Sequence, residues 1–555
     1  MGYDDISERI DSSLNTGRRP FLSGIMTALF VNGGLSVITD KVGATSQAGN
    51  ENWPQQVKLI ADDGESGDAF GNSVALDGNT ILIGAPGHGS AYIFSYANGS
   101  WTQQAELTTG DINGDFFGYS VALDGDTALI GASRDGEPNG RRAGSAYIFT
   151  HSGGDWNQQA KLVPNDGDSR DWFGQRVALE NDTAVIGAPH DEDPNGDLSG
   201  SAYIFTRSNG NWSQQTKLTP NDGDQDDIFG SSVAIDGNTV LIGAQGNENP
   251  NGDSAGSAYV FIRSNGDWIQ EEKLVADDGD SIDLFGYSVA LDSETALIGA
   301  EGDEDPNGVR AGSAYVFTRS SGNWSQQAKL SADDGDADDS FGWAVALEGD
   351  IGLIGARDDD DPNGESAGSA YIFTRSDGQW SQETKLAAND GDSIDQFGAS
   401  VATNGRTAII GATGDEDPLG YYAGSAYVFG QNRIQIEIEI KPDSDQNIIN
   451  KNSKGLLPVA VLQTDDFDPT KYLDESSVRF GNAENVSVSN SEGASPAHKN
   501  GHIEDVNNDG RNDFLFHFPI EKIDVGEGTF KGKLVAKRTD GTPLVGTETA
   551  EVLSE

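Results

Sequence analysis

Short apolar runs rich in β-branched and aromatic residues alternate with turn residues through most of the chain. In the stretch that begins at Phe229, the runs are Ser232–Ile235, Thr239–Ile242, Ser257–Phe261 and Trp268–Leu274. Gly, Asn and Asp separate the runs, and the period of an amphipathic helix does not occur in them. The pattern therefore predicts four strands joined by turns, which form one antiparallel sheet.

This four-strand unit recurs seven times. The last five intervals between copies are all 56 residues and the first is 47. A unit of this size cannot bury its apolar face alone, so the copies must pack on one another, and sheets arranged around an axis form a β-propeller. The dipeptide Phe-Gly opens the copies at Phe70, Phe117, Phe173, Phe229, Phe285, Phe341 and Phe397.

The two ends of the repeat region indicate a closed ring. A fourth-strand segment of the form Trp-x-Gln-Gln precedes the first Phe-Gly, at residues 53–59, and none follows the last third-strand segment, Ser425–Phe429. The N-terminal segment can complete the last blade, whereas an open solenoid would have atypical capping repeats at both ends. We therefore expect a seven-bladed propeller of four-stranded antiparallel blades.

A different region begins after Arg433. The alternating strand Ile434–Lys441 has one apolar face, and further short strands follow it, which predicts a β-sandwich-like domain. The chain is thus expected to be all-β. Its predicted parts are an N-terminal segment 1–49, the propeller 50–431 and the sandwich-like domain 432–555.

The repeat resembles the FG-GAP repeat of integrin α-subunit propellers, through Phe-Gly, a Ser-Val-Ala strand and Ile-Gly-Ala-Pro, as at Ile83–Pro86 and Ile186–Pro189. The resemblance covers residues 53–430 and implies an extracellular propeller that binds partners. Each Phe is expected to fill space between blades, and each Gly to allow close backbone approach. The calcium loop of such relatives lies between the first and second strands. Here a tight turn such as Asp236–Asn238 takes its place, so that site is not expected.

Carboxylates gather in two other connections of each repeat. Between the second and third strands, oxygen donors at positions 1, 3 and 5 followed by Gly match the start of a calcium loop, although Ala stands at position 12. A second acidic segment, such as Asp278–Asp283, leads to the next repeat, and both connections emerge at one end of an antiparallel blade. Solvated surface acid without a bound ion is the alternative. The predicted Ca²⁺ ligands are Asp191, Asp193, Asn195, Asp303, Asp305, Asn307, Asp359, Asp361 and Asn363.

The C-terminal region contains a more specific motif. Oxygen donors stand at positions 1, 3, 5 and 9 with Gly at position 6, and a backbone carbonyl is available at position 7. This motif predicts a Ca²⁺ loop, with an Asx-turn hairpin loop as the alternative. Phe516 replaces the bidentate Glu of an EF-hand, so a modest affinity is expected. The predicted ligands are Asp505, Asn507, Asp509, Arg511 and Asp513.

The charge of the chain narrows the range of partners and environments. Asp and Glu number 90 against 35 Lys and Arg, a formal net charge of −55 at pH 7. This balance excludes nucleic acid and anionic membranes as partners. It is typical of extreme halophiles such as halophilic archaea, because concentrated salt shortens the Debye length. No Cys is present, which excludes disulfides and thiol chemistry.

The N-terminal segment resembles a twin-arginine export signal. Arg18 and Arg19 precede Phe21 and Leu22 and a modest apolar run. We therefore expect a secreted or cell-surface monomer without a membrane span in its mature chain. A single membrane anchor is the alternative, but polar and glycine residues near Asn32 interrupt a run that is already short.

Three classes of function fit this sequence: a non-catalytic binding or adhesion module for a protein or glycan, a polysaccharide lyase or hydrolase, and a surface-layer scaffold. A catalytic group should break the near-identity of the repeats. The breaks are scattered over several blades, at His88, His190, Arg141–Arg142, Arg310, Tyr421–Tyr422, Trp172 and Trp343. Such a distribution favours a recognition surface. The predicted contact residues are Tyr421, Tyr422, Arg310 and Arg141, because exposed aromatic and Arg side chains anchor interfaces.

Overall fold

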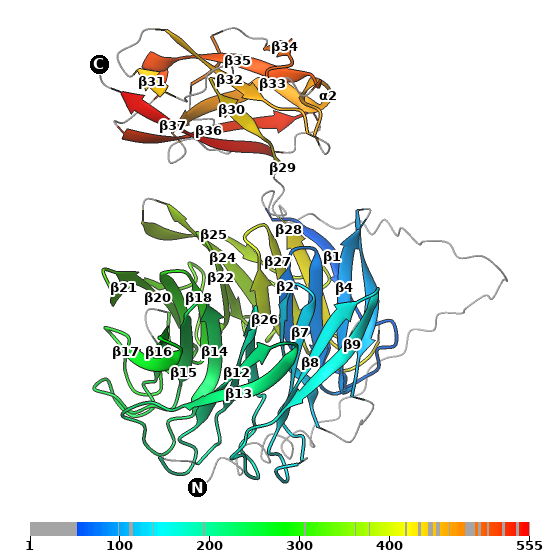
Figure 1. Ribbon diagram of the computed structural model, residues 1–555, viewed down its shortest axis with the longest axis vertical. Helices are drawn as coiled ribbons and strands as arrows, with labels where there is room; N and C mark the ends of the chain where they lie inside the picture. Colours follow the sequence, from blue (N-terminus) through cyan, green and yellow to red (C-terminus); the bar gives the residue numbers. More distant parts are fainter. Residues whose placement is uncertain are drawn as a thin grey trace, which may run out of the picture. The chain divides into compact units, whose positions relative to one another are not determined.

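The structure is a computed structural model, and a propeller and a C-terminal pair of sheets make up its described part (Figure 1). The Arg18–Arg19 pair lies outside the described residues. The residues described are 53–97, 99–109, 115–136, 138–192, 195–304, 307–360, 362–376, 378–416, 419–430, 434–441, 448–450, 455–464, 467–482, 494–497, 501–507, 510–523, 528–539 and 543–553.

Each blade is a four-stranded antiparallel sheet whose strands follow one another in sequence. Blade 1 contains β2 (Ser73–Asp77), β3 (Thr80–Ala85), β4 (Ser90–Ala97) and β5 (Ser100–Leu107). Blade 2 contains β6 (Phe117–Asp124), β7 (Thr127–Ala132), β8 (Ser145–Ser152) and β9 (Asp155–Leu162). Blade 3 contains β10 (Arg176–Glu180), β11 (Thr183–Ala188), β12 (Ser201–Ser208) and β13 (Asn211–Leu218).

The remaining blades repeat this order. Blade 4 contains β14 (Phe229–Asp236), β15 (Thr239–Ala244), β16 (Ser257–Ser264) and β17 (Asp267–Leu274). Blade 5 contains β18 (Ser288–Asp292), β19 (Thr295–Ala300), β20 (Ser313–Ser320) and β21 (Asn323–Leu330). Blade 6 contains β22 (Phe341–Glu348), β23 (Ile351–Ala356), β24 (Ser369–Ser376) and β25 (Gln379–Leu386).

Blade 7 closes the ring with the strand at the start of the described chain. It combines β26 (Phe397–Thr403), β27 (Thr407–Ala412) and β28 (Ser425–Gly430) with β1 (Gln55–Leu59), which pairs antiparallel with β28. The predicted closure is therefore confirmed. The first strands of successive blades contact one another around the ring, so these strands line the central axis.

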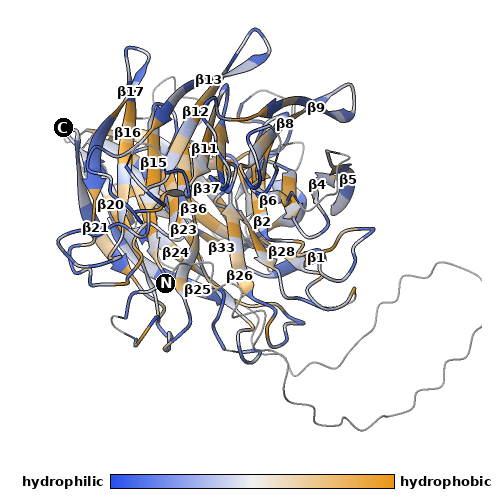
Figure 2. Ribbon diagram, turned by 90° about the horizontal axis from the view of Figure 1, so that it is seen from below, coloured by the Kyte–Doolittle hydropathy of each residue, from blue (hydrophilic) through white to orange (hydrophobic). Residues whose placement is uncertain are grey.

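Apolar side chains from neighbouring blades pack together around the Phe of each Phe-Gly pair. Phe173 is buried and makes edge contacts with the rings of Tyr203 and Phe205, at centroid distances of 5.5 and 5.9 Å. Its backbone N–H donates to the carbonyl of Ala143 in the preceding blade at 2.9 Å. Figure 2 shows the apolar inner strands and the hydrophilic outer hairpins that result. The expected role of Phe between blades is confirmed.

The Gly after each Phe is required by both its dihedral angle and its surroundings. Gly342 has φ +90°, and a Cβ at this position would lie 2.3 Å from the carbonyl oxygen of Ser313. Such a contact is far below van der Waals distance, and L-residues rarely adopt this φ. The close approach predicted from the Phe-Gly pair is thus a property of the backbone itself.

The C-terminal part contains two facing sheets. One pairs β29 (Ile434–Gln435), β37 (Pro543–Leu553), β36 (Gly528–Arg538) and β33 (Leu473–Asn482), with β31 (Ile448–Asn450) also on β37. The other pairs β30 (Ile438–Ile440), β32 (Leu456–Val461), β35 (Asp513–Pro519) and β34 (His502–Glu504). One apolar core joins side chains of both sheets, as in a sandwich. The short helix α2 (Pro469–Tyr472) and the 3₁₀ turn η1 (Ile520–Lys522) complete the description.

Candidate functional site

In blades 3, 5, 6 and 7 the two acidic connections meet, and the cation that lies between them is a lysine ammonium. In blade 5, Lys329 Nζ lies 2.9 Å from Asp278, in the connection that leads from the preceding blade and that we call the incoming connection. The same Nζ lies 2.9 Å from Asp303, in the connection between the second and third strands. The prediction that both acidic segments share one end of the blade is therefore confirmed. The same bridge recurs as Lys58 with Asp390 and Asp415, Lys217 with Asp166 and Asp191, and Lys385 with Asp334 and Asp359.

A buried tyrosine completes each lysine bridge. The Tyr315 hydroxyl donates to Asp303 at 2.5 Å, and Lys329 Nζ lies 5.4 Å from the centre of the Tyr315 ring. Burial lowers the pKa of Lys329, but hydrogen bonds to Asp278 and Asp303 outweigh that effect and leave the pKa raised. The ammonium therefore stays charged and offsets the cost of burying Asp303.

The amide side chains of these loops also have protein partners. Asn307 Nδ2 donates to the carbonyl of Ala332, and Asn363 Nδ2 to that of Ala388, each at 3.0 Å. The predicted ligands Asp191, Asp303 and Asp359 are buried and are bonded to a lysine and a tyrosine. Asn195 is half-buried in the equivalent loop of blade 3. Asp193, Asp305 and Asp361 lie outside the described residues, and Ca²⁺ at these loops stays a prediction.

A second carboxylate of the incoming connection is buried without a lysine contact of its own. Asp339 accepts the backbone N–H of Asp336 at 2.7 Å and is 6 % exposed. Burial is the main cause that raises the pKa of Asp339 to about 7. The equivalent Asp171 and Asp283 have pKa values raised to about 7 and about 6, again chiefly by burial. This end of the propeller therefore carries acids that titrate near neutral pH.

Sequence reasoning missed the lysine of the outer strand. The sequence contains a signal for this lysine. A Lys stands two residues after the Gln-Gln or Gln-Glu pair of the outer strand in every copy except one, which has Glu106. Only the twist of the blade places the lysine ammonium between two loops from different parts of the repeat.

Arginine and aromatic side chains gather where the first strands line the axis. The Arg357 guanidinium lies 3.7 Å from the centre of the Trp343 ring, and Tyr287 lies 4.7 Å from Trp343. In other blades, Arg134 lies 3.9 Å from the Phe116 ring. We call this group the axial cluster, and it comprises Phe116, Tyr119, Arg134, Trp172, Arg176, His190, Tyr287, Trp343 and Arg357.

Electrostatic interactions connect the blades within the axial cluster. Burial raises the pKa of Tyr119, but the nearby charge of Arg176 outweighs it, so the pKa is lowered. Burial and then Glu301 raise the pKa of Tyr287, whereas Arg176 and Arg357 act in the opposite direction. Groups from blades 2, 3, 5 and 6 thus lie within range of one another. The Trp172 and His190 rings, at the positions equivalent to Phe116 and Arg134, stack at 3.9 Å.

The predicted contact residues lie in loops at the same end as the lysine bridges. Tyr421 is 60 % exposed, and its ring lies 4.4 Å from that of Tyr422. Arg310 contacts Glu301 at 3.2 Å, and Glu301 also acts on Tyr287 of the axial cluster. Arg141 is exposed, and among the described residues no contact joins its side chain to the others. The structure thus brings Arg310 toward the cluster and leaves Arg141 apart.

The C-terminal loop closes around two carboxylates. Asp505 Oδ2 accepts the N–H of Gly510 at 3.0 Å, and Gly510 has φ +84°. Asp513 is fully buried and accepts the N–H of Gln463 at 2.7 Å and of Val506 at 3.1 Å. These contacts fit both a Ca²⁺ loop and an Asx-turn loop, since a carboxylate oxygen has more than one lone pair. Asn507 is exposed and Arg511 half-buried, while Asp509 lies outside the described residues.

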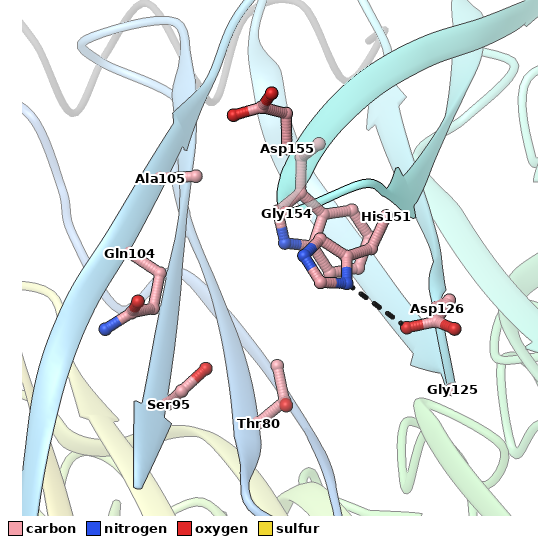
Figure 3. Close-up of a pocket in the computed structure, with 10 residues that line it drawn as sticks. Thr80, Ser95, Gln104, Ala105, Gly125, Asp126, His151, Gly154 and Asp155 are labelled. Carbon is pink, nitrogen blue, oxygen red and sulfur yellow. Dashed lines mark hydrogen bonds and ion pairs between the residues drawn. The ribbon is translucent and has the colours of Figure 1, made fainter. Parts of the chain in front are cut away.

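A shallow groove of about 310 Å³ lies between blades 1 and 2. Figure 3 shows Gln104 and Ser95 on one side, and His151 with Asp126 on the other. His151 Nδ1 lies 3.3 Å from Asp126 Oδ1. The turns that line the groove join the first to the second and the third to the fourth strands, so the groove belongs to the end opposite the lysine bridges.

Seven four-stranded blades around an axis define a seven-bladed β-propeller, and the family comparison gives its type. The FG-GAP repeat model matches residues 53–94, 101–149, 156–205, 212–261, 268–317, 324–373 and 380–429. The chain belongs to the FG-GAP repeat family.

The other comparisons add little. No curated protein sequence is significantly similar to the chain. A chain of the solved structure titled "Crystal Structure of Mitotic Checkpoint Complex" aligns with 75 % of this chain and 99 % of its own length, at 13 % identity and a TM-score of 0.43. Within the part of the chain that the structure describes, no helix has the length and apolarity needed to cross a membrane.

Proposed function

We propose that the protein is a non-catalytic extracellular binding protein that engages an anionic glycan at the axial cluster. The observation that supports this proposal is the stacking of arginines on aromatic rings at the axis, at positions where the repeats differ from one another. Aromatic faces bind sugar rings, and guanidinium groups bind carboxylate or sulfate in a fixed geometry. In a chain with net charge −55, such a group of arginines is a local site for an anion.

The test compares two arginine–tryptophan pairs of the same blade. Arg357 contacts Trp343 at the axis, whereas Arg375 lies 5.4 Å from the Trp380 ring at the outer edge. Binding of polygalacturonate and chondroitin sulfate oligosaccharides is measured by calorimetry, with neutral dextran as the control ligand. Arg357→Ala is expected to weaken binding by about tenfold or more, as for an anchor residue, and Arg375→Ala to leave it unchanged. Equal effects of the two variants, or no binding, would refute the proposal.

A protein partner and an enzymatic function are the competing possibilities. If the anionic glycans do not bind while a secreted protein is retained through Arg310 and Tyr421, the site is a protein interface. If polygalacturonate is shortened and Arg357→Ala abolishes the cleavage, the propeller is a lyase or hydrolase. Ordered self-association in Ca²⁺ would instead favour a surface-layer scaffold.

We further propose that Ca²⁺ stabilises the C-terminal loop. The contact from Gly510 N–H to Asp505 supports this proposal, because it closes the loop between positions 1 and 6 of the motif. Thermal unfolding is measured in molar KCl with and without Ca²⁺. A rise in melting temperature that Asp509→Ala abolishes is expected. A rise that persists in Asp509→Ala would assign the ion to the acidic propeller loops, and no rise would exclude both sites.

A further inference from the structure

Blade 1 departs from the other blades where they hold the lysine bridge. Its outer strand carries Glu106 in place of Lys217 and its equivalents, and its shortened connection carries His88 in place of Asp191. The backbone supports the second correspondence. The N–H groups of His88 and Asp191 each donate to the carbonyl three residues earlier, at 3.1 and 3.2 Å. Blade 1 has therefore exchanged both the cation and one of its carboxylate partners.

Three side chains converge at this place without direct hydrogen bonds between them. His88 Nε2 lies 3.9 Å from Asp63 Oδ2 and 3.8 Å from Glu106 Oε1, and all three ligand atoms lie within 4.8 Å of one another. The lysines of the other blades contact their carboxylates at 2.7–3.1 Å. The wider spacing is close to the separation of about 3.4 Å between ligand atoms around a tetrahedral zinc ion with bonds of about 2.1 Å.

Neighbouring groups orient two of these three side chains. The buried Asp68 places its Oδ2 3.4 Å from His88 Nδ1, so that the other ring nitrogen, Nε2, faces Asp63 and Glu106. Ser90 Oγ donates to Glu106 Oε1 at 2.7 Å. A carboxylate behind the distal nitrogen of a histidine is the usual outer contact of a metal-binding imidazole.

A buried tyrosine lies beside the cluster, since the rings of Tyr92 and His88 are 6.4 Å apart. Tyr92 is fully buried and, like Tyr259 in blade 4, stands without the buried Asp that accepts the tyrosine hydroxyl in other blades. Its equivalent, Tyr203, donates to Asp191 at 2.6 Å. Because the Tyr259 hydroxyl also lacks a partner among the described residues in blade 4, the position of Tyr92 reflects the replaced Asp and is not itself a sign of a ligand. The Tyr92 hydroxyl is nevertheless available as an outer contact of the cluster.

We propose that Asp63, His88 and Glu106 bind a divalent transition-metal ion, with Zn²⁺ as the best match. One imidazole and two carboxylates suit zinc, whereas Ca²⁺ and Mg²⁺ prefer oxygen ligands alone. The three ligands leave a fourth position for water, which can accept the hydrogen bond of Tyr92. The ion then joins the incoming loop of blade 1 to its outer strand, as the lysine does in the other blades. This inference is independent of the proposed glycan site.

The test measures Zn²⁺ binding to the full chain by calorimetry after removal of metal with a chelator. The wild type is expected to bind one equivalent that His88→Gln and Glu106→Lys weaken by about 10- to 100-fold. Glu106→Lys restores the residue of the other blades, so its metal-free melting temperature should not fall below that of the wild type. Asp68→Asn, which changes a positioning residue, should weaken binding by about tenfold. His151→Gln, at a partly exposed histidine outside the cluster, is the control and should bind as the wild type does.

Three outcomes would overturn the assignment. If the wild type shows no micromolar Zn²⁺ binding, the three side chains do not form a metal site. If the equivalent persists in both His88→Gln and Glu106→Lys, the ion is bound elsewhere. If Ca²⁺ at equal concentration displaces Zn²⁺, the site selects hard cations and the role assigned to the imidazole is wrong.

Discussion

Replacing Lys329 by Met tests whether the lysine bridges hold the propeller together. Lys329 contacts Asp278 and Asp303, whose side chains are 46 % and 3 % exposed. Loss of one partner of a fully buried pair costs about 3–5 kcal/mol, and loss of an exposed pair costs about 0–1 kcal/mol. Since the Lys329 side chain is itself 21 % exposed, we expect Lys329→Met to lower the free energy of unfolding by about 2–3 kcal/mol.

Blade 4 supplies a matched control within the same molecule. Its lysine, Lys273, contacts the half-exposed Asp222 at 2.7 Å, and Asn247 stands where the other blades have the buried carboxylate. Both lysines lie over a tyrosine ring, at 5.4 and 5.3 Å, so that contribution cancels in the comparison. Met keeps most of the apolar stem in each variant. Lys273→Met should therefore cost only about 0.5–1 kcal/mol.

Urea unfolding at several pH values distinguishes the bridge from general effects on the blade. The pKa of Lys329 is raised above its ordinary 10.5, so its contribution is complete below pH 10.5 and is lost only as the pH rises above that value. Lys329 also lowers the pKa of Asp283, which burial raises to about 6. In Lys329→Met this pKa rises further, so the variant should regain stability as the pH falls from 8 to 5. Equal losses in Lys329→Met and Lys273→Met, or no dependence on pH, would refute the reasoning.

Two further predictions concern the blade interfaces and the buried acids. Gly342→Ala should lower the free energy of unfolding by at least about 3 kcal/mol, because a Cβ would lie 2.3 Å from Ser313 O. Gly322 has φ +85° but open space around it, so Gly322→Ala should cost only about 1 kcal/mol. Similar melting temperatures for the two variants would contradict this prediction. Asp339→Asn should stabilise the protein at pH 8 by up to about 4 kcal/mol and have little effect at pH 4.5. The pKa of Asp339 is raised to about 7 in the folded protein, so Asp339 makes the wild type less stable as the pH rises from 4 to 7. If Asp339→Asn instead loses stability at pH 8, Asp339 is needed as a charge.

The sequence was sufficient to predict the blades, their order and the closure of the ring. Each depends on local patterns: alternating strands, turn residues, and the displaced segment that became β1. The shared end of the two acidic connections also followed, because the direction of an antiparallel strand fixes where its loops emerge. These features need no knowledge of how one blade faces the next.

The contacts between blades could not be predicted in this way. Arg176 and Tyr287 are more than one hundred positions apart in the sequence, and only the curvature of the ring places them within electrostatic range. Arg141 and Arg310 occupy similar loop positions and were predicted together, yet only Arg310 has a carboxylate, Glu301, beside it. The difference depends on one residue after the second strand, which varies from blade to blade.

The blades differ from one another at the position of the lysine bridge. In blade 4 one position of the lysine bridge has changed, to Asn247, and the lysine remains with one carboxylate. In blade 1 the loop is shorter, and His88 and Glu106 replace the acid and the lysine together. Independent drift would leave the carboxylates of Asp63 and Glu106 facing each other, and such a pair of like charges is unfavourable. A metal ion shared by His88, Asp63 and Glu106 removes that repulsion. The carboxylate of Asp68 at 3.4 Å from His88 Nδ1, which orients the imidazole toward the two acids, favours the metal ion.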